Sequence, residues 1–227
     1  MLVFQDMVNN GAYSFLIDTA LPTLGMKKGF SHRASKETRA HFENSAEETL
    51  SLLYNHPSVV YYTVFNEGWG QYEDGGRIYQ NLKAQDPTRI YDTASGWFTP
   101  SLSDVQSEHI YFKKLELRAR DLPLVLSEFG GYSCKIEGHS FNLDKTYGYR
   151  TCKTASDLEN DLEHLYLDEV IPSIRQGLSA AILTQVSDVE DETNGLLTYD
   201  RRILKVDPVR MTEIARGLME AFEDAAK

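Results

Sequence analysis

Cysteine is scarce in this sequence. Cys134 and Cys152 are the two cysteines among its 227 residues. Two thiols do not make the disulfide framework of a small secreted protein, and no Cys-x-x-Cys pair or other Cys/His spacing indicates a metal site. The sequence therefore predicts neither a metal nor any other cofactor.

Long apolar runs are also missing. No stretch approaches the roughly 18 consecutive apolar residues that a membrane-spanning helix needs, and no charged-then-apolar leader opens the chain. We therefore expect no membrane partner, no signal peptide and a cytoplasmic protein.

Basic residues are outnumbered, because 23 Lys and Arg stand against 34 Asp and Glu, which gives a net charge of -11. A protein that binds nucleic acid needs a surplus of Lys and Arg on one face, so the charge argues against a nucleic-acid partner. A chain of this length, with 41% hydrophobic and 25% charged residues, is most simply one soluble globular domain.

The main feature that is present is an alternation of strands and helices. The run Val59–Phe65 is rich in β-branched and aromatic residues without polar alternation, which predicts a strand buried on both faces of a parallel sheet. Further strands are expected at Leu2–Phe4, Arg89–Thr93, within Asp104–Tyr111, and at Pro123–Ser127 and Leu178–Val186. About six strands that alternate with helices are typical of an α/β barrel or a doubly wound sheet.

The expected helices have recognisable starts. Apolar residues at helical spacing predict a helix from about Ser35 to Tyr54. A capping box at Ser156–Glu159 is expected to open a second helix, and Asp207 as N-cap with Pro208 at the first position predicts the last one.

Two of the predicted strands end in glutamate. Val59–Phe65 leads into Asn66-Glu67-Gly68-Trp69-Gly70, and Pro123–Ser127 leads into Glu128-Phe129-Gly130-Gly131. Ionisable groups, aromatic rings and glycines at the carboxyl ends of buried parallel strands are typical of the active sites of barrel and open-sheet enzymes. Taken singly, a glutamate before such a turn is more often a solvated turn residue.

Both blocks resemble glycoside hydrolase family 2. The first block is His56-Pro57-Ser58-Val59 together with Asn66–Gly70, and the second is Leu126–Gly131. The resemblance implies an α/β fold of the (β/α)8 TIM-barrel type. The first strand of this chain resembles strand three of the family barrel and its last strand resembles strand eight.

The resemblance therefore implies an incomplete barrel. Residues 1–227 would be a catalytic domain that lacks the first barrel strands and the β-sandwich domains that precede them in family 2. Because a closed barrel takes eight strands, we expect exposed strand edges, association into a homodimer and weak activity of the isolated chain.

Glu67 and Glu128 are the candidate catalytic residues. Retaining hydrolysis needs an acid/base carboxyl and a nucleophilic carboxylate about 5 to 5.5 Å apart. The block that contains Glu67 resembles the acid/base block of the family, and the block that contains Glu128 resembles its nucleophile block. The resemblance therefore implies that Glu67 is the acid/base and Glu128 the nucleophile. Asn66, beside the acid/base, is expected to donate to the sugar 2-hydroxyl.

Aromatic and imidazole side chains complete the candidate site. Trp69 and Trp97 could stack on sugar rings, and Trp97 could equally cover the rim. His109 and Tyr111 are candidates to orient Glu128 or to bind hydroxyls, with a hydrogen-bonded core position as the alternative for each.

The end of the last predicted strand departs from the family pattern. Many members carry Trp at the end of strand eight, whereas this chain has Thr184-Gln185-Val186. An acidic run at Asp188 and Glu190–Glu192 lacks the spacing of a calcium loop, so a solvated loop is the favoured interpretation.

The function that the sequence predicts is a retaining β-glycosidase of the β-galactosidase type, with a carbohydrate as its partner. The alternatives are a β-mannosidase, a β-glucuronidase or an endo-acting mannanase, which share the two-glutamate machinery. A non-enzyme alternative is an inactive carbohydrate-binding fragment.

Overall fold

The computed structural model describes residues 1–9, 14–26, 34–72, 75–111 and 113–227. The chain divides into two compact units. Unit 1 comprises Met1–His109 and Arg120–Val125, and unit 2 comprises Ile110–Ala119 and Leu126–Lys227. Each unit is described by itself below.

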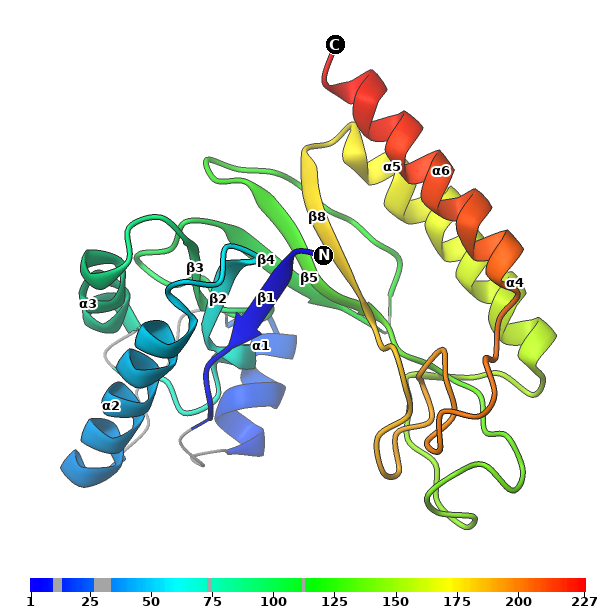
Figure 1. The fold of residues 1–227 in the computed structure, drawn as a ribbon, viewed down its shortest axis with the longest axis horizontal. Helices are drawn as coiled ribbons and strands as arrows, with labels where there is room; N and C mark the ends of the chain where they lie inside the picture. Colours follow the sequence, from blue (N-terminus) through cyan, green and yellow to red (C-terminus); the bar gives the residue numbers. More distant parts are fainter. Residues whose placement is uncertain (10–13, 27–33, 73–74, 112) are drawn as a thin grey trace. The chain divides into compact units, whose positions relative to one another are not determined.

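Unit 1 is built on a parallel three-stranded sheet in the order β1-β2-β3 (Figure 1). Its strands are β1 (Val3–Asp6), β2 (Val59–Phe65) and β3 (Ile90–Ala94). The helical segments are η1 (Phe15–Ala20), α1 (Leu21–Thr23), α2 (Lys36–Leu53), the short 3-10 turn η2 (Asn66–Gly68) and α3 (Gly76–Gln85).

The predicted first helix is confirmed. Helix α2 begins after Ser35, whose side chain accepts a hydrogen bond from the Thr38 N–H at 3.1 Å and so caps the first turn. Phe42, Ala46 and Leu50 are the buried residues of α2, and they recur every four residues along one face. The helix therefore covers the sheet with a single apolar stripe.

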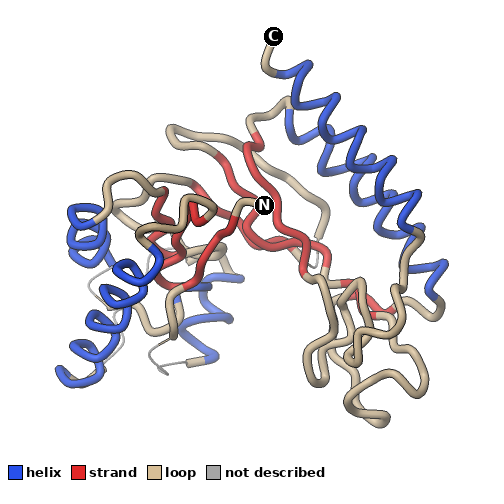
Figure 2. Tube along the Cα trace, viewed as in Figure 1, coloured by secondary structure: helices blue, strands red, loops and turns tan. Residues whose placement is uncertain are grey.

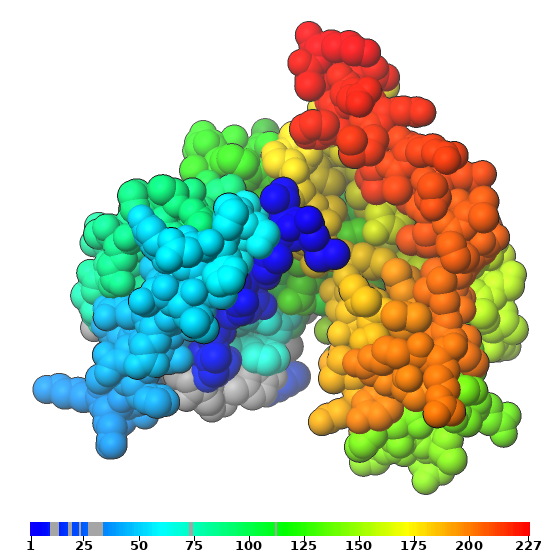
Figure 3. Space-filling view, in the orientation of Figure 1, coloured from blue at the N-terminus to red at the C-terminus, as the bar shows by residue number. Residues whose placement is uncertain are grey.

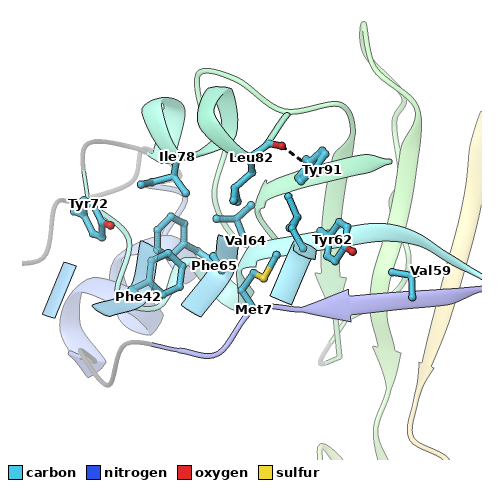
Figure 4. Packing of buried hydrophobic residues seen from close by; sticks show 12 residues of the cluster. Met7, Phe42, Val59, Tyr62, Val64, Phe65, Tyr72, Ile78, Leu82 and Tyr91 are labelled. Atoms are coloured by element: carbon cyan, nitrogen blue, oxygen red, sulfur yellow. Dashed lines mark hydrogen bonds between the residues drawn. The ribbon is translucent and has the colours of Figure 1, made fainter. Parts of the chain in front are cut away.

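Strand β2 is the centre of this core, as its apolar sequence predicts. All of its residues except Val60 are buried. On one face, Tyr62 and Val64 pack with residues of α2 and α3 (Figure 4). On the other, Tyr61 stacks on Phe4 of β1 with ring centroids 4.1 Å apart.

Unit 2 holds the remaining helices. They are α4 (Ala155–Leu165), η4 (Tyr166–Val170), α5 (Ile171–Ile174) and α6 (Pro208–Ala225). Helix α6 packs against α5 and α4 and lies at the surface, drawn orange to red (Figure 3). Asp207 caps α6 as predicted, and its side chain accepts from the Val209 N–H at 2.8 Å.

The predicted capping box of α4 is wrong by two residues. The N-cap is Thr154, whose hydroxyl accepts from the Asp157 N–H while the Asp157 carboxylate accepts from the Thr154 N–H. Asp157 therefore occupies the third helical position of the capping box, for which the sequence predicts Glu159.

A second sheet has the order β4-β5-β8. Its strands are β4 (Gln106–Ile110), β5 (Leu124–Gly130) and β8 (Leu178–Thr184), and the boundary between the units passes through β4 and β5. Two short strands, β6 (Tyr132–Ser133) and β7 (Arg150–Thr151), pair in parallel. The six predicted strands are thus present, in two sheets rather than one closed barrel. Strand β5 is longer than predicted, so Glu128 lies within it.

The loops that follow β5 and β8 are joined by backbone hydrogen bonds (Figure 2). Cys134 N–H donates to Thr193 O at 2.9 Å, and Tyr147 N–H donates to Asp191 O at 2.7 Å. These hydrogen bonds hold the two loops together in one layer.

Among the described residues, no helix has the length and apolar character needed to cross a bilayer.

A buried ion pair lies within this layer. Lys205 Nζ contacts Asp188 Oδ1 at 2.6 Å, and both side chains are at most 1% exposed. The same ammonium donates to Thr193 O at 3.0 Å. Asp188 is therefore not part of a solvated acidic loop, as its sequence context favoured, but an internal partner of a lysine.

We predict that Lys205→Ala lowers the free energy of unfolding by about 3–5 kcal/mol, because it leaves the Asp188 carboxylate buried without its cation. Urea denaturation measures the change. Lys227→Ala is the matched control, because Lys227 pairs with Asp224 while 76% exposed, and it should change stability by at most about 0.5 kcal/mol. Equal effects of the two substitutions would contradict this account.

Candidate active site

Glu67 is held in a constrained position directly after β2. Glu67 is 6% exposed. Its backbone dihedral angles, φ 52° and ψ 19°, lie in the left-handed region that residues other than glycine rarely adopt. Such a conformation costs on the order of 1–3 kcal/mol and persists where the surroundings impose it. The strain therefore marks Glu67 as a residue that its neighbours hold in place.

Ser95, at the end of β3, supplies part of that hold. The Glu67 N–H donates to Ser95 Oγ at 3.0 Å, and the Ser95 hydroxyl donates to Asn66 Oδ1 at 2.9 Å. One serine thus fixes the backbone of Glu67 and the side chain of Asn66. Ser95 had no signal of its own in the sequence beyond its place in the loop after a strand.

His109 of β4 contacts Glu67. Its Nδ1 lies 3.3 Å from Glu67 Oε1, and its side chain is 1% exposed. The ring fits because residue 96 is glycine: a Cβ there would lie 2.3 Å from His109 Cγ, and Gly96 has φ +78. The structure therefore places His109 beside the predicted acid/base.

The two tryptophans of the predicted site lie in unit 1. The Trp97 ring meets the His109 ring edge-on, with centroids 6.4 Å apart and planes at 72°. The Trp69 N–H donates to Asn66 O at 2.9 Å, which closes the turn that carries Glu67. Both tryptophans are partly exposed.

Asp92 is a buried carboxyl that the sequence reasoning missed. It is 1% exposed on β3, and Tyr61 OH donates to its Oδ2 at 2.9 Å. Burial raises its pKa to about 6, although hydrogen bonds from Ser107 and Tyr61 and the nearby His109 lower it. The available signal was a lone aspartate inside an otherwise uncharged buried strand.

The surroundings of Glu128 lie in unit 2. Tyr111 OH donates to Glu128 Oε2 and lies 3.1 Å from Thr184 Oγ1. Burial raises the pKa of Tyr111, as do the charge of Glu128 and the hydrogen bond to it, so the phenol stays protonated and donates. A donor to a carboxylate favours its charged form, which is the form a nucleophile needs.

Thr184 ends β8 at the position where the sequence departs from the family pattern. Its hydroxyl contacts Tyr111, and the peptide bond to Gln185 is cis. Gln185 Nε2 donates to Glu192 Oε2 at 2.8 Å and to Asn194 Oδ1 at 2.7 Å, which ties the end of β8 to the following loop. A hydroxyl and an amide therefore stand at the end of β8.

Comparison with protein families identifies the class. The family model described as "Glycosyl hydrolases family 2, TIM barrel domain" matches residues 12–122, a range that includes Glu67 and ends before Glu128. The resemblance that the sequence predicts is confirmed by this match, which covers residues 12–122. No curated protein matches the chain.

Solved structures show the same fold. A family 2 β-galacturonidase from Eisenbergiella tayi, bound to galacturonate, has a TM-score of 0.56 and 16% identity, over 82% of this chain and 38% of that one. A β-D-glucuronidase of Dictyoglomus thermophilum has a TM-score of 0.54 and 15% identity, over 94% of this chain and 44% of that one. A β-glucuronidase from Bacteroides uniformis has a TM-score of 0.53 and 16% identity, over 87% of this chain and 29% of that one. The chain spans less than half the length of each.

We predict that Asp92→Asn removes a pH dependence of stability. Because the folded-state pKa of Asp92 is raised from 3.8 to about 6, the folded state binds the extra proton and loses up to about 3 kcal/mol as pH rises from about 4 to 7. Urea denaturation at several pH values should show a flatter profile for Asp92→Asn than for the wild type.

Asp104→Asn is the control of opposite sign. Burial raises the pKa of Asp104, but hydrogen bonds from Lys83, the Tyr91 N–H and Tyr79 lower it overall. This substitution should therefore destabilise most near neutral pH and progressively less as pH falls through the lowered folded-state pKa. Parallel pH profiles for wild type and Asp92→Asn would refute the assignment of the raised pKa to Asp92.

Proposed function

We propose that the protein is a retaining β-glycosidase. The observation that carries the proposal is the family 2 match over residues 12–122, which includes Glu67, buried and held by Ser95 at the end of β2. The donation from Tyr111 to Glu128 supports the role of the second glutamate. Fold likeness alone does not define a reaction, so the proposal depends on these side chains.

The proposed reaction has two steps. In the first, the Glu128 carboxylate attacks the anomeric carbon, the glycosidic bond breaks, and Glu67 gives its proton to the leaving oxygen. In the second, water gives a proton to Glu67 and attacks the anomeric carbon, which releases Glu128. The mechanism requires the two carboxyl groups about 5 to 5.5 Å apart.

The neighbouring side chains have separate roles in this proposal. Asn66, held by Ser95, donates to the sugar 2-hydroxyl, and Tyr111 stabilises the charged form of Glu128. His109 lies against Glu67 and orients its carboxyl group. Trp69 and Trp97 offer partly exposed rings for the apolar face of a sugar.

The substrate that we propose first is a β-galactoside, as the sequence resemblance indicates. A uronide is the second candidate, because the structures with the same fold come from β-glucuronidases and a β-galacturonidase. A β-mannoside is a third sugar within the same machinery. Hydrolysis rates on a panel of nitrophenyl glycosides decide among these sugars. A comparison of the activity of this chain with that of the full-length protein tests whether the chain alone is an inactive carbohydrate-binding fragment.

We predict opposite azide products for the two glutamates. Glu128→Ala should abolish turnover, and added azide should then give the α-glycosyl azide from a β-glycoside, because azide replaces the nucleophile. Glu67→Ala should spare substrates with activated leaving groups and give the β-glycosyl azide.

Anomer-resolved NMR of the azide products measures the outcome. Glu137→Ala is the control, because Glu137 is exposed in the loop after β6, and it should leave turnover unchanged. Exchanged stereochemistry between Glu67→Ala and Glu128→Ala would reverse the assigned roles, and full activity of both would refute the proposed function.

A further inference from the structure

Tyr111 has a second neighbour besides the groups at its hydroxyl. The ring of Tyr149 lies flat against the Tyr111 ring, with centroids 3.8 Å apart and planes at 13°. Tyr111 thus contacts Glu128 and Thr184 with its hydroxyl and Tyr149 with its face. Because the hydroxyl is at the far end of the side chain, a tilt of the ring moves it more than any other atom.

Gly131 makes room for this stack. It follows β5 with φ +65, and a Cβ on it would lie 2.5 Å from Tyr149 Cδ2 and 3.1 Å from Tyr111 Cδ1. The Tyr149 N–H also donates to Gly131 O at 3.0 Å. The end of the strand that carries Glu128 therefore fixes the backbone of Tyr149 and accommodates its ring.

The outer side of the stack is supported as well. Tyr147 packs edge-on against Tyr149, with centroids 5.7 Å apart and planes at 70°. The Tyr147 backbone is tied to the loop after β8 through Asp191 and Thr193. Tyr149 is consequently held by its contacts with Gly131 and Tyr147 and by the hydrogen bonds that join the two loops.

We propose that Tyr149 is a positioning residue for the nucleophile: its stack on Tyr111 holds the hydroxyl that donates to Glu128. The inference rests on the proposed function, because it assigns Glu128 as the group that is positioned. In this proposal Tyr149 acts on the nucleophile through Tyr111.

Substitutions at both sides of the contact test the proposal. Tyr149→Ala removes the stacking ring and should lower kcat/KM about 10- to 100-fold, since small displacements of catalytic groups have effects of that order. Tyr149→Phe keeps the ring and should stay within about 2-fold of wild type. Gly131→Ala should reproduce the loss, because its Cβ displaces Tyr149.

Gly138→Ala is the matched control for backbone strain. Gly138 also has positive φ, +76, yet a Cβ there would meet nothing within 4 Å. It should therefore show the strain of an alanine in this conformation and no loss of kcat/KM. Equal losses in Gly131→Ala and Gly138→Ala would overturn the argument that the clash with Tyr149 matters.

The pH profile separates positioning from simple support of the fold. When Tyr111 loses its alignment, the Glu128 carboxylate loses a donor, so the acidic limb of kcat/KM should move to higher pH in Tyr149→Ala and Gly131→Ala. A residue that only stabilises the fold would lower the melting temperature and leave this limb in place. An unmoved limb in Tyr149→Ala overturns the proposal.

A titration without turnover keeps this test independent of the proposed function. In protein labelled with 13C at the glutamate carboxyls, the Glu128 signal is assigned by its loss in Glu128→Gln and followed with pH by NMR. A higher Glu128 pKa in Tyr149→Ala than in wild type and Tyr149→Phe supports the positioning role, and an equal value overturns it. If wild type has no glycosidase activity, the proposed function fails while the titration still decides the role of Tyr149.

Discussion

The burial of β2 on both faces is the constraint on which the rest of unit 1 depends. One face packs Tyr62 and Val64 against helices, and the other stacks Tyr61 on Phe4. A strand without a solvent face cannot slip in register without exposing apolar side chains, so its end is fixed in space. Glu67 follows directly after that strand, and its strained backbone conformation persists because the strand before it is packed on both faces.

Several polar groups around the candidate site are matched to particular partners. Ser95 links Asn66 and Glu67, Tyr61 donates to Asp92, and Tyr111 donates to Glu128. An unmatched donor or acceptor in such surroundings would cost about 1–3 kcal/mol. These hydrogen bonds therefore stabilise the fold and hold the carboxyl groups in place at the same time.

The strands and the helices that begin after Ser35 and Asp207 could be predicted because their signals are local. Asp92 could not, since its partner Tyr61 is 31 positions away in the chain, and nothing in the sequence pairs Asp188 with Lys205, 17 positions later. The start of α4 was misplaced because Thr154 and Ser156 are both good N-caps, and side-chain geometry chooses between them. The placement of His109 beside Glu67 likewise depends on Gly96, whose missing Cβ makes the space.

In the proposed mechanism, Glu128 forms a covalent bond to the sugar during turnover. The most direct measurement is mass spectrometry of peptides from the complete protein after incubation with a 2-deoxy-2-fluoro-β-glycoside of the preferred sugar and a good leaving group, which slows release of the intermediate. We expect a single glycosyl adduct on the peptide that contains Glu128, and on Glu128 itself. An adduct on Glu67, or hydrolysis of the preferred glycoside with inversion and no adduct at all, would contradict it.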